Sequence, residues 1–180
     1  MPDASEPRLS PLPPDDWDDL LRLVVEDSPG GIERPPNVFT TLARAPELFR
    51  AFIGFGAALR NGRLGARERE LLILRTAHNA GSRYEWTHHV PMAVATGLSD
   101  DEIDRLRGAA ADPGWSAEDA ALVAAADELY HDSTIGDDTW AALASRYDDA
   151  ELIELIMLVG EYRLLSMALG ALRIQLENEV

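Results

Sequence analysis

The segment 66–79 constrains the fold of this chain more than any other. Its centre, residues 71–74 (LLIL), is apolar in every direction around a helix, whereas a surface helix keeps one polar face. Such a helix needs neighbours on nearly every side. No part of the sequence alternates apolar and polar residues with the period of two that is typical of a strand. The sequence therefore predicts an all-α protein of about eight helices.

Apolar residues at helical spacing and helix-starting residues locate the other helices. Pro46 and the capping box at 99–102 mark two starts, and Pro91 should kink or delay a third helix because it removes a backbone hydrogen bond. The expected helices are 15–26, 37–43, 46–60, 66–79, 82–96, 116–131, 138–145 and 149–177, plus one from the capping box. Residues 1–14 are expected to form a mobile or surface-draped arm, and 15–180 a single domain.

Composition excludes several classes of function. The chain has 180 residues, of which 32 are acidic and 16 basic, for a net charge of −16. A chain this acidic repels nucleic-acid phosphates and anionic membrane surfaces, so neither is an expected partner. There is no cysteine. Disulfides, thiolate metal sites and thiol catalysis are therefore excluded.

Neither the N-terminus nor the longest apolar stretch has the features of a targeting or membrane segment. The N-terminal residues lack the basic and apolar regions of a signal peptide. The apolar stretch 152–172 is interrupted by Glu154, Glu161 and Arg163, which favours a buried helix over a membrane span. We therefore expect a cytoplasmic protein. The uncharged faces of this last helix exceed what one small domain needs, which favours a homo-oligomer.

Residues 67–97 concentrate titratable side chains in apolar sequence. In a helix over 66–79, Glu70 falls on an apolar stripe, so its carboxylate has to be paired, hydrogen-bonded or protonated. In the next helix, Glu85 and His89 are four residues apart and can meet side by side. If the two helices form an antiparallel hairpin, Glu70 faces this pair. Two carboxylates and an imidazole around one spot are suited to general acid/base catalysis.

Structural roles compete with catalysis for these residues. A Glu and a His four apart commonly form an ion pair that only holds helices together, and the chain would then be a non-enzymatic helical oligomer. Arg75 can bind a substrate carboxylate, or pair with Glu68 or an acid on another helix. Tyr84 and Trp86 can line a pocket or belong to the core. His88 does not share the face of the Glu–His pair.

A metal site is a further alternative. Glu85-x-x-His88 and Glu128-x-x-His131 both have the spacing found in carboxylate-bridged di-iron helices. The further glutamates that such a site needs are available at Glu70 and at Glu154 or Glu161. Against this, His131 sits at a helix end, and so short a motif arises easily by chance in an acidic chain.

Several segments resemble a known family. NVFTTLARAPELFRAF and RERELLILRTAHNAGSRYEWTHHVPMAVATGLSDDEI, then WSAEDAALVAAADELYHD and ELIELIMLVGEYRLLSMAL, are similar to the carboxymuconolactone decarboxylase-like family of the AhpD-like (alkylhydroperoxidase) superfamily. The resemblance covers residues 37–170, and its most specific part runs from Glu70 through His89 to Leu98. It implies an AhpD-like helical bundle.

The resemblance also bears on the chemistry. Thiol-dependent members carry a Glu followed by Cys-x-x-Cys-x-x-x-His, and alignment places that Glu at Glu70, the His at His89, and the cysteines at Ser82 and Glu85. A hydroxyl and a carboxylate cannot replace a thiolate and its resolving thiol. A hydroperoxide reductase is therefore disfavoured, although the superfamily suggests one.

The decarboxylase-like members, which also lack the cysteine pair, are the better match. They imply a homo-oligomer (dimer, trimer or hexamer) with no metal and no organic cofactor, acting on a small molecule as a carbon–carbon lyase or isomerase. By this resemblance, Glu70 or Glu85 moves a proton together with His89. The residues expected to contact a carboxylate or lactone substrate are Arg75, Tyr84, Trp86, His88 and His89.

Overall fold

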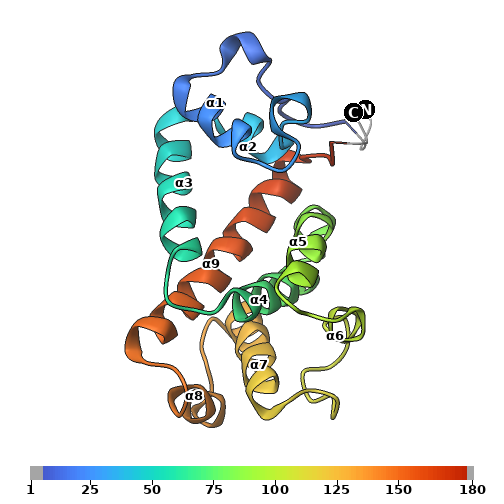
Figure 1. The fold of residues 1–180 in the computed structure, drawn as a ribbon, viewed down its shortest axis with the longest axis vertical. Coiled ribbons are helices and arrows are strands. Elements are labelled where there is room, and N and C mark those ends of the chain that lie inside the picture. Colours follow the sequence, from blue (N-terminus) through green and yellow to red (C-terminus); the bar gives the residue numbers. More distant parts are fainter. Residues whose placement is uncertain (1–5, 178–180) are drawn as a thin grey trace. The chain divides into compact units, whose positions relative to one another are not determined.

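The computed structural model describes residues 6–177, and within this range the chain is entirely helical. It forms nine α-helices and two short 3-10 helices in the described range, as the absence of a period of two predicts (Figure 1). The 3-10 helices are Pro14–Asp16 and Gly31–Glu33. The α-helices are α1 (Asp19–Glu26), α2 (Asn37–Leu42), α3 (Pro46–Arg60), α4 (Ala66–Asn79), α5 (Arg83–Ala95), α6 (Asp100–Arg105), α7 (Ala117–Asp132), α8 (Asp137–Ala144) and α9 (Asp149–Leu172).

The described chain groups into two compact units, with boundaries inside α3 and α9. One unit takes residues up to 58 and from 168 onward, and the other takes residues 59–167. The first has its own small core, formed by Trp17, Leu21, Val25, Ala43 and Phe49. Burial of these side chains holds α1, α2 and the start of α3 together.

The second unit is built around α4. Leu71, Leu72 and Leu74 are fully buried, and α4 packs mainly against α5 and α7. The larger core of the molecule surrounds it and includes Leu122 and Leu155 from α7 and α9. The prediction that this helix has neighbours on nearly every side is therefore confirmed.

Residues before α1 lie along the first unit through backbone hydrogen bonds. The amide of Arg8 donates to the carbonyl of Leu172, and that of Leu12 donates to Thr40. The arm predicted at 1–14 is thus laid on the surface over residues 6–14, while residues 1–5 of that prediction lie outside the described range. The single domain predicted over 15–180 stays a prediction beside the two units seen here.

Two helix ends differ from the sequence prediction. The first α-helix begins at Asp19, not after Pro14, because Asp18 adopts extended backbone and its carboxylate accepts the amide of Leu21 at 2.8 Å. The last helix ends at Leu172 and not at 177, because Arg173 takes a left-handed conformation with φ of 53°.

The helix α5 continues past its proline. It runs without interruption from Arg83 to Ala95 with Pro91 inside, so the predicted delayed start does not occur. The capping box predicted at 99–102 is present, with Ser99 and Glu102 each bonding the other's backbone amide.

The helix α9 is long and apolar enough to cross a membrane by length and composition alone. A core helix of a soluble protein passes the same test, so this finding is weak evidence. One side of α9 is buried in the core through Leu155, Leu158 and Val159. Another side exposes large apolar residues, namely Ile153, Met157, Leu164 and Met167.

Candidate active site

The turn between α4 and α5 brings Glu70 into contact with His89. Gly81 has φ of 62°, a left-handed conformation that glycine adopts without strain, and this reverses the chain between the two helices. Ser82 then caps α5, its hydroxyl accepting the amide of Glu85 at 3.4 Å. With these starts fixed, His89 Nδ1 lies 2.8 Å from Glu70 Oε2.

The second ring nitrogen of His89 faces another carboxyl group. His89 Nε2 lies 3.6 Å from Glu85 Oε2, one helical turn earlier on α5. The structure thus brings together the three residues that the sequence places in one site. A neutral imidazole has a single N–H, so it cannot donate to both carboxylates. The 3.6 Å contact is too long for a hydrogen bond, so a neutral ring can donate its N–H to Glu70 and keep Nε2 as a proton acceptor on the side of Glu85.

Burial strengthens the electrostatic interactions among Glu70, Glu85 and His89. Glu70 is 9% exposed and Glu85 is 3% exposed. Burial raises the pKa of Glu85, and the negative charge of Glu70 adds to this effect. The nearby His89 and His88 oppose the shift because a positive imidazole stabilises the carboxylate. The site therefore favours a protonated carboxyl more than an exposed glutamate would.

Two neighbouring residues of α9 complete the cluster. The ring of Tyr162 meets the ring of His89 edge-on, with centroids 5.1 Å apart and planes at 85°. Burial raises the pKa of the Tyr162 hydroxyl well above its usual value, so the tyrosine stays neutral. Burial and the charge of Glu85 raise the pKa of Glu161 to about 7.

The sequence analysis missed Tyr162 and considered Glu161 only as an iron ligand. A signal was present, because Glu161 interrupts the apolar run 152–172 just as Glu70 interrupts α4. A charged residue inside an apolar stripe indicates either a buried pair or a site. Local sequence does not predict which helix packs against each such residue.

Arg75 lies apart from the cluster and has a structural role. Its guanidinium binds both carboxylate oxygens of Asp127, at 2.5 Å and 2.7 Å. It also donates to the carbonyls of Leu106 and Gly108, at 2.6 Å each. All three nitrogens are thus engaged, which leaves the guanidinium committed to α7 and the end of α6. Of the two roles open to Arg75, this is the ion pair with an acid on another helix.

The other residues expected to contact the substrate, Tyr84, Trp86 and His88, have different surroundings. Tyr84 is buried and its ring lies 4.5 Å from that of His88, between centroids. Trp86 packs against the larger core beneath the guanidinium of Arg107, 4.4 Å from its ring centroid. Of these residues, His88 is close enough to Glu85 to lower the pKa of that carboxyl. His88 is therefore the candidate that the structure brings nearest to the cluster chemistry.

The di-iron alternative does not fit the arrangement. Among residues 6–177, no three His, Asp or Glu side chains are placed to hold a metal ion. Glu128 instead accepts hydrogen bonds from the amide of Gly136 and the hydroxyl of Thr139. Glu154 accepts the amides of Arg63 and Leu64. Two of the proposed ligands therefore stabilise loops and helix starts.

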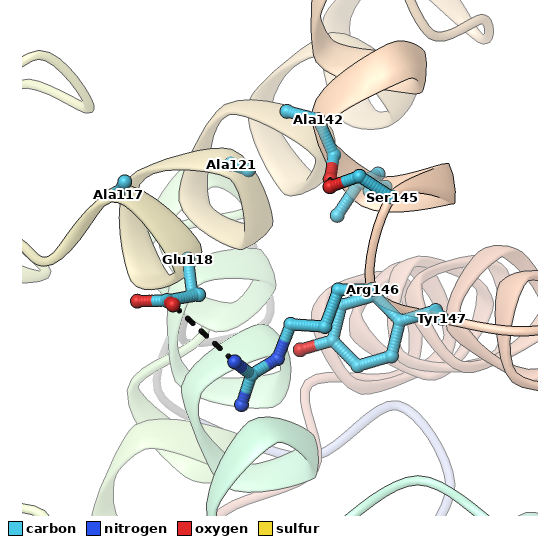
Figure 2. Close-up of a pocket in the computed structure, with 8 residues that line it drawn as sticks. Ala117, Glu118, Ala121, Ala142, Ser145, Arg146 and Tyr147 are labelled. Carbon is cyan, nitrogen blue, oxygen red and sulfur yellow. Dashed lines mark hydrogen bonds and ion pairs between the residues drawn. The ribbon is translucent and has the colours of Figure 1, made fainter.

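A surface pocket of about 380 Å³ lies between the start of α7 and the end of α8 (Figure 2). Arg146 crosses it toward Glu118, 3.4 Å away, and the ring of Tyr147 lies beside the guanidinium. None of the cluster residues lines this pocket.

The fold is of the AhpD-like helical class, as comparison with solved structures shows. A debrominase, Bmp8, solved both free and as a variant in complex with 2,3,4-tribromopyrrole, superposes with a TM-score of 0.76 at 18% identity, covering 95% of this chain and 92% of that chain. An uncharacterized peroxidase-related protein with an AhpD core from Ralstonia eutropha JMP134 gives 0.75 at 21% identity, covering 93% and 92%. A protein of unknown function from Agrobacterium tumefaciens gives 0.69 at 22% identity, covering 75% and 94%. At such identities the likeness shows the fold alone.

Part of the chain is similar to the carboxymuconolactone decarboxylase family. The model of the carboxymuconolactone decarboxylase family matches residues 46–128, which include Glu70, Glu85 and His89. This match confirms the resemblance predicted from the sequence, for a chain without cysteine. No curated protein matches the sequence.

Proposed function

We propose that this protein is a cofactor-free enzyme that acts on a small carboxylate- or lactone-bearing molecule, as a carbon–carbon lyase or an isomerase. The observation that carries the proposal is His89 between two buried carboxyl groups, at 2.8 Å from Glu70 and 3.6 Å from Glu85. An imidazole between two carboxyl groups is suited to accepting and donating a proton in general acid/base catalysis. The family match supports the same class of reaction, since its name describes the decarboxylation of a lactone acid.

The proposed chemistry is a proton transfer coupled to a change at carbon. In the decarboxylation, the bond from carbon to the substrate carboxylate breaks and CO2 leaves. The electron pair stays on carbon, delocalised into the neighbouring carbonyl, and takes a proton from the cluster. His89 and Glu85 exchange that proton, while Glu70 orients the imidazole through Nδ1. In an isomerisation, the same groups remove a proton at one carbon and return it at another.

We assign recognition of an acidic substrate to the histidines of α5. Arg75 is engaged with Asp127 and two carbonyls, which occupy four of the five N–H groups of its guanidinium. Protonated His88 or His89 is the cation that we assign to the substrate carboxylate or lactone oxygen. This assignment requires the substrate to reach α5.

Steady-state assays on lactone acids test the proposal. His89→Ala and Glu85→Gln should each lower kcat by about 100-fold or more, because general acid/base groups contribute on that scale. Glu118→Gln, at an exposed ion pair by the surface pocket, is the matched control and should retain full activity. Wild-type rates in both His89→Ala and Glu85→Gln would contradict the proposed site.

A structural role for the cluster is the competing function, and one observation favours it. Glu70, Glu85 and His89 pair with one another, and the surface pocket is lined by other residues. A non-enzymatic helical oligomer would lose stability in His89→Ala and would show no turnover in the wild type. Thermal unfolding of the same variants, measured beside turnover, separates the two functions.

We also propose that the protein is a cytoplasmic homo-oligomer whose subunits associate through α9. The exposed apolar residues Ile153, Met157, Leu164 and Met167 recur at spacings of four, seven and three, which place them on one side of a helix as a single stripe. Leu164 is 56% exposed. Gly160 lies within the stripe and permits close approach of a second helix.

A further inference from the structure

The surface pocket between α7 and α8 takes no part in the proposed reaction (Figure 2). Its volume of about 380 Å³ lies in the range of pockets that hold small organic molecules. The residues of the proposed catalytic cluster do not line it. Half of its lining residues are apolar, and most of these are alanines, whose small side chains leave room between the helices. The apolar residues are Ala117, Ala121, Ala142 and Leu143.

Arg146 is the cation of the pocket, and the protein's own carboxylates hold it loosely. Its Nη1 lies 3.4 Å from Glu118 Oε1 and its Nη2 lies 3.9 Å from Glu68 Oε1, both beyond the usual length of an N–H···O hydrogen bond. By contrast, the guanidinium of Arg75 binds both oxygens of Asp127 at 2.5 Å and 2.7 Å. The Arg146 side chain is also 49% exposed. Ion pairs this long and exposed contribute little to stability, so a bound carboxylate can replace them at small cost.

Tyr147 adds a second hydrogen-bond donor to the pocket. Its hydroxyl oxygen is buried and makes no hydrogen bond to any residue between 6 and 177. The guanidinium of Arg146 lies over the ring, with Cζ 5.8 Å from the ring centroid, but not in hydrogen-bond geometry with the hydroxyl. Burial, and next the charge of Glu68, raise the pKa of this hydroxyl, so it keeps its proton. A buried hydroxyl is normally paired with a protein group, water or a ligand, so this one is available to a molecule beside Arg146.

We propose that this pocket binds a small organic monocarboxylate with an apolar body, at a site separate from the proposed catalytic cluster. The carboxylate pairs with the guanidinium of Arg146, whose fork of N–H groups matches two carboxylate oxygens, and accepts from the hydroxyl of Tyr147. The apolar body lies against the alanines and is removed from water there. Glu118 and Glu68 repel a second negative charge, which restricts the ligand to one carboxylate. This site is additional to the proposed function and does not depend on it.

Titration of the protein with benzoate, followed by backbone amide shifts in nitrogen-15 NMR, tests this site. The amide signals of Ala121, Arg146 and Tyr147 should move, with a dissociation constant on the order of 1 mM for so small a ligand. Benzamide has the same shape without the charge and should bind about 10-fold more weakly. Arg146→Gln should weaken benzoate binding by about 10-fold, and Tyr147→Phe, which removes only the hydroxyl, by about threefold.

Two further variants control for charge and for place. Arg63→Gln also removes an exposed arginine, whose ion pair with Asp148 lies outside the pocket, and should leave benzoate binding unchanged. Ala142→Leu should block benzoate by filling the pocket while every charge stays in place. Since Ala142 is exposed, this substitution leaves the core intact.

Equal affinity for benzoate and benzamide would overturn the proposal, as would benzoate binding that survives Arg146→Gln unchanged or an absence of shifts at the pocket. His89→Ala distinguishes the pocket from the proposed catalytic cluster. Benzoate binding should be retained in this variant, because His89 does not line the pocket. Loss of binding in His89→Ala, with shifts confined to α5, would show that the acid binds at the cluster and would contradict a separate site.

Discussion

His89 lies between two carboxyl groups, and its protonation determines what the proposed site can do. A carboxyl group lies beside each of its nitrogens, yet the neutral ring offers one N–H. Glu161, on α9, is a further buried carboxyl group, and the charge of Glu85 acts on it. Burial raises the pKa of Glu85 and of Glu161, so each keeps its proton to a higher pH than an exposed carboxyl group does. A buried carboxyl group with a raised pKa beside an imidazole is suited to the acid/base chemistry proposed for Glu85 and His89.

Glu161 should make stability depend on pH in a defined direction. Its pKa rises from 4.5 to about 7 on folding, so between these values the folded protein binds a proton that the unfolded chain releases. Stability from this group is fully present below about pH 4.5 and is lost as pH rises through about 7. Glu161→Gln should remove roughly 1 to 3 kcal/mol of that pH dependence.

Urea unfolding at several pH values between these limits measures this effect. Glu85 makes the unfolding free energy depend on pH in the same direction. The unfolding free energy of Glu161→Gln should therefore fall less steeply with pH than that of the wild type, but it should still fall. Glu118→Gln, whose carboxylate is exposed, should keep the wild-type slope. An equally steep fall of stability in Glu161→Gln would show that this carboxyl ionises normally in the folded state.

Part of the site could be predicted from the sequence because it depends on local geometry. Glu85 and His89 are one helical turn apart, and the turn at Gly81 reverses the chain over two regular helices, so the meeting with Glu70 follows. Glu161 and Tyr162 come from a helix more than 60 residues later in the sequence. Their approach depends on how α9 packs, and no local pattern encodes that.

At the scale of helices, the ion pair between Arg75 and Asp127 ties α4 to α7. Asp127→Ala would leave the guanidinium of Arg75, 5% exposed, without its partner anion. The two carbonyls that remain do not neutralise it. We expect a loss of about 3 kcal/mol in unfolding free energy, because breaking one side of a buried pair strands the other charge.

Chemical denaturation measures this loss against a matched surface pair. Glu118→Ala breaks the exposed pair with Arg146 and should cost less than about 1 kcal/mol. Similar losses in the two variants would show that the Arg75 pair is no more important than a surface contact. The sequence left Arg75 open between substrate binding and pairing, because Asp127 becomes its neighbour only when α7 packs against α4.

The helices themselves were largely predictable, and their ends less so. The apolar run of α4 and the capping box of α6 are local signals, and both appear as expected. The predicted end of α9 was wrong by several residues, because the sequence beyond Leu172 contains no glycine or proline that would indicate a helix end. The chain instead turns at Arg173, and Asn37 donates to the carbonyl of Gln175 at 2.9 Å. That tertiary contact favours the early stop.

At the scale of the whole molecule, the apolar stripe of α9 predicts self-association. Leu164→Glu should shift the protein to a smaller species in size-exclusion chromatography with light scattering, because it places a charge in the apolar stripe. Leu23→Glu is the matched control, since Leu23 is also exposed, at 63%, but lies on α1. A monomeric wild type, or an assembly unaffected by Leu164→Glu, would contradict this interface.

The absence of cysteine from the whole chain predicts the absence of thiol peroxidase turnover. With a dithiol reductant and an organic hydroperoxide, peroxide consumption should not exceed the rate without protein. Two solved structures of this fold are described as peroxidase-related, so the assay is a fair comparison. Robust turnover would contradict the argument that Ser82 and Glu85 cannot replace the two thiols.

The most direct test of the central claim is CO2 release from lactone acids by the wild type and His89→Ala at neutral pH. We predict turnover by the wild type and a rate at least about 100-fold lower in His89→Ala, with the helical circular dichroism unchanged. Equal rates in the two proteins, or no release from any lactone acid by the wild type, would contradict the assignment of acid/base decarboxylation to the Glu70–His89–Glu85 cluster.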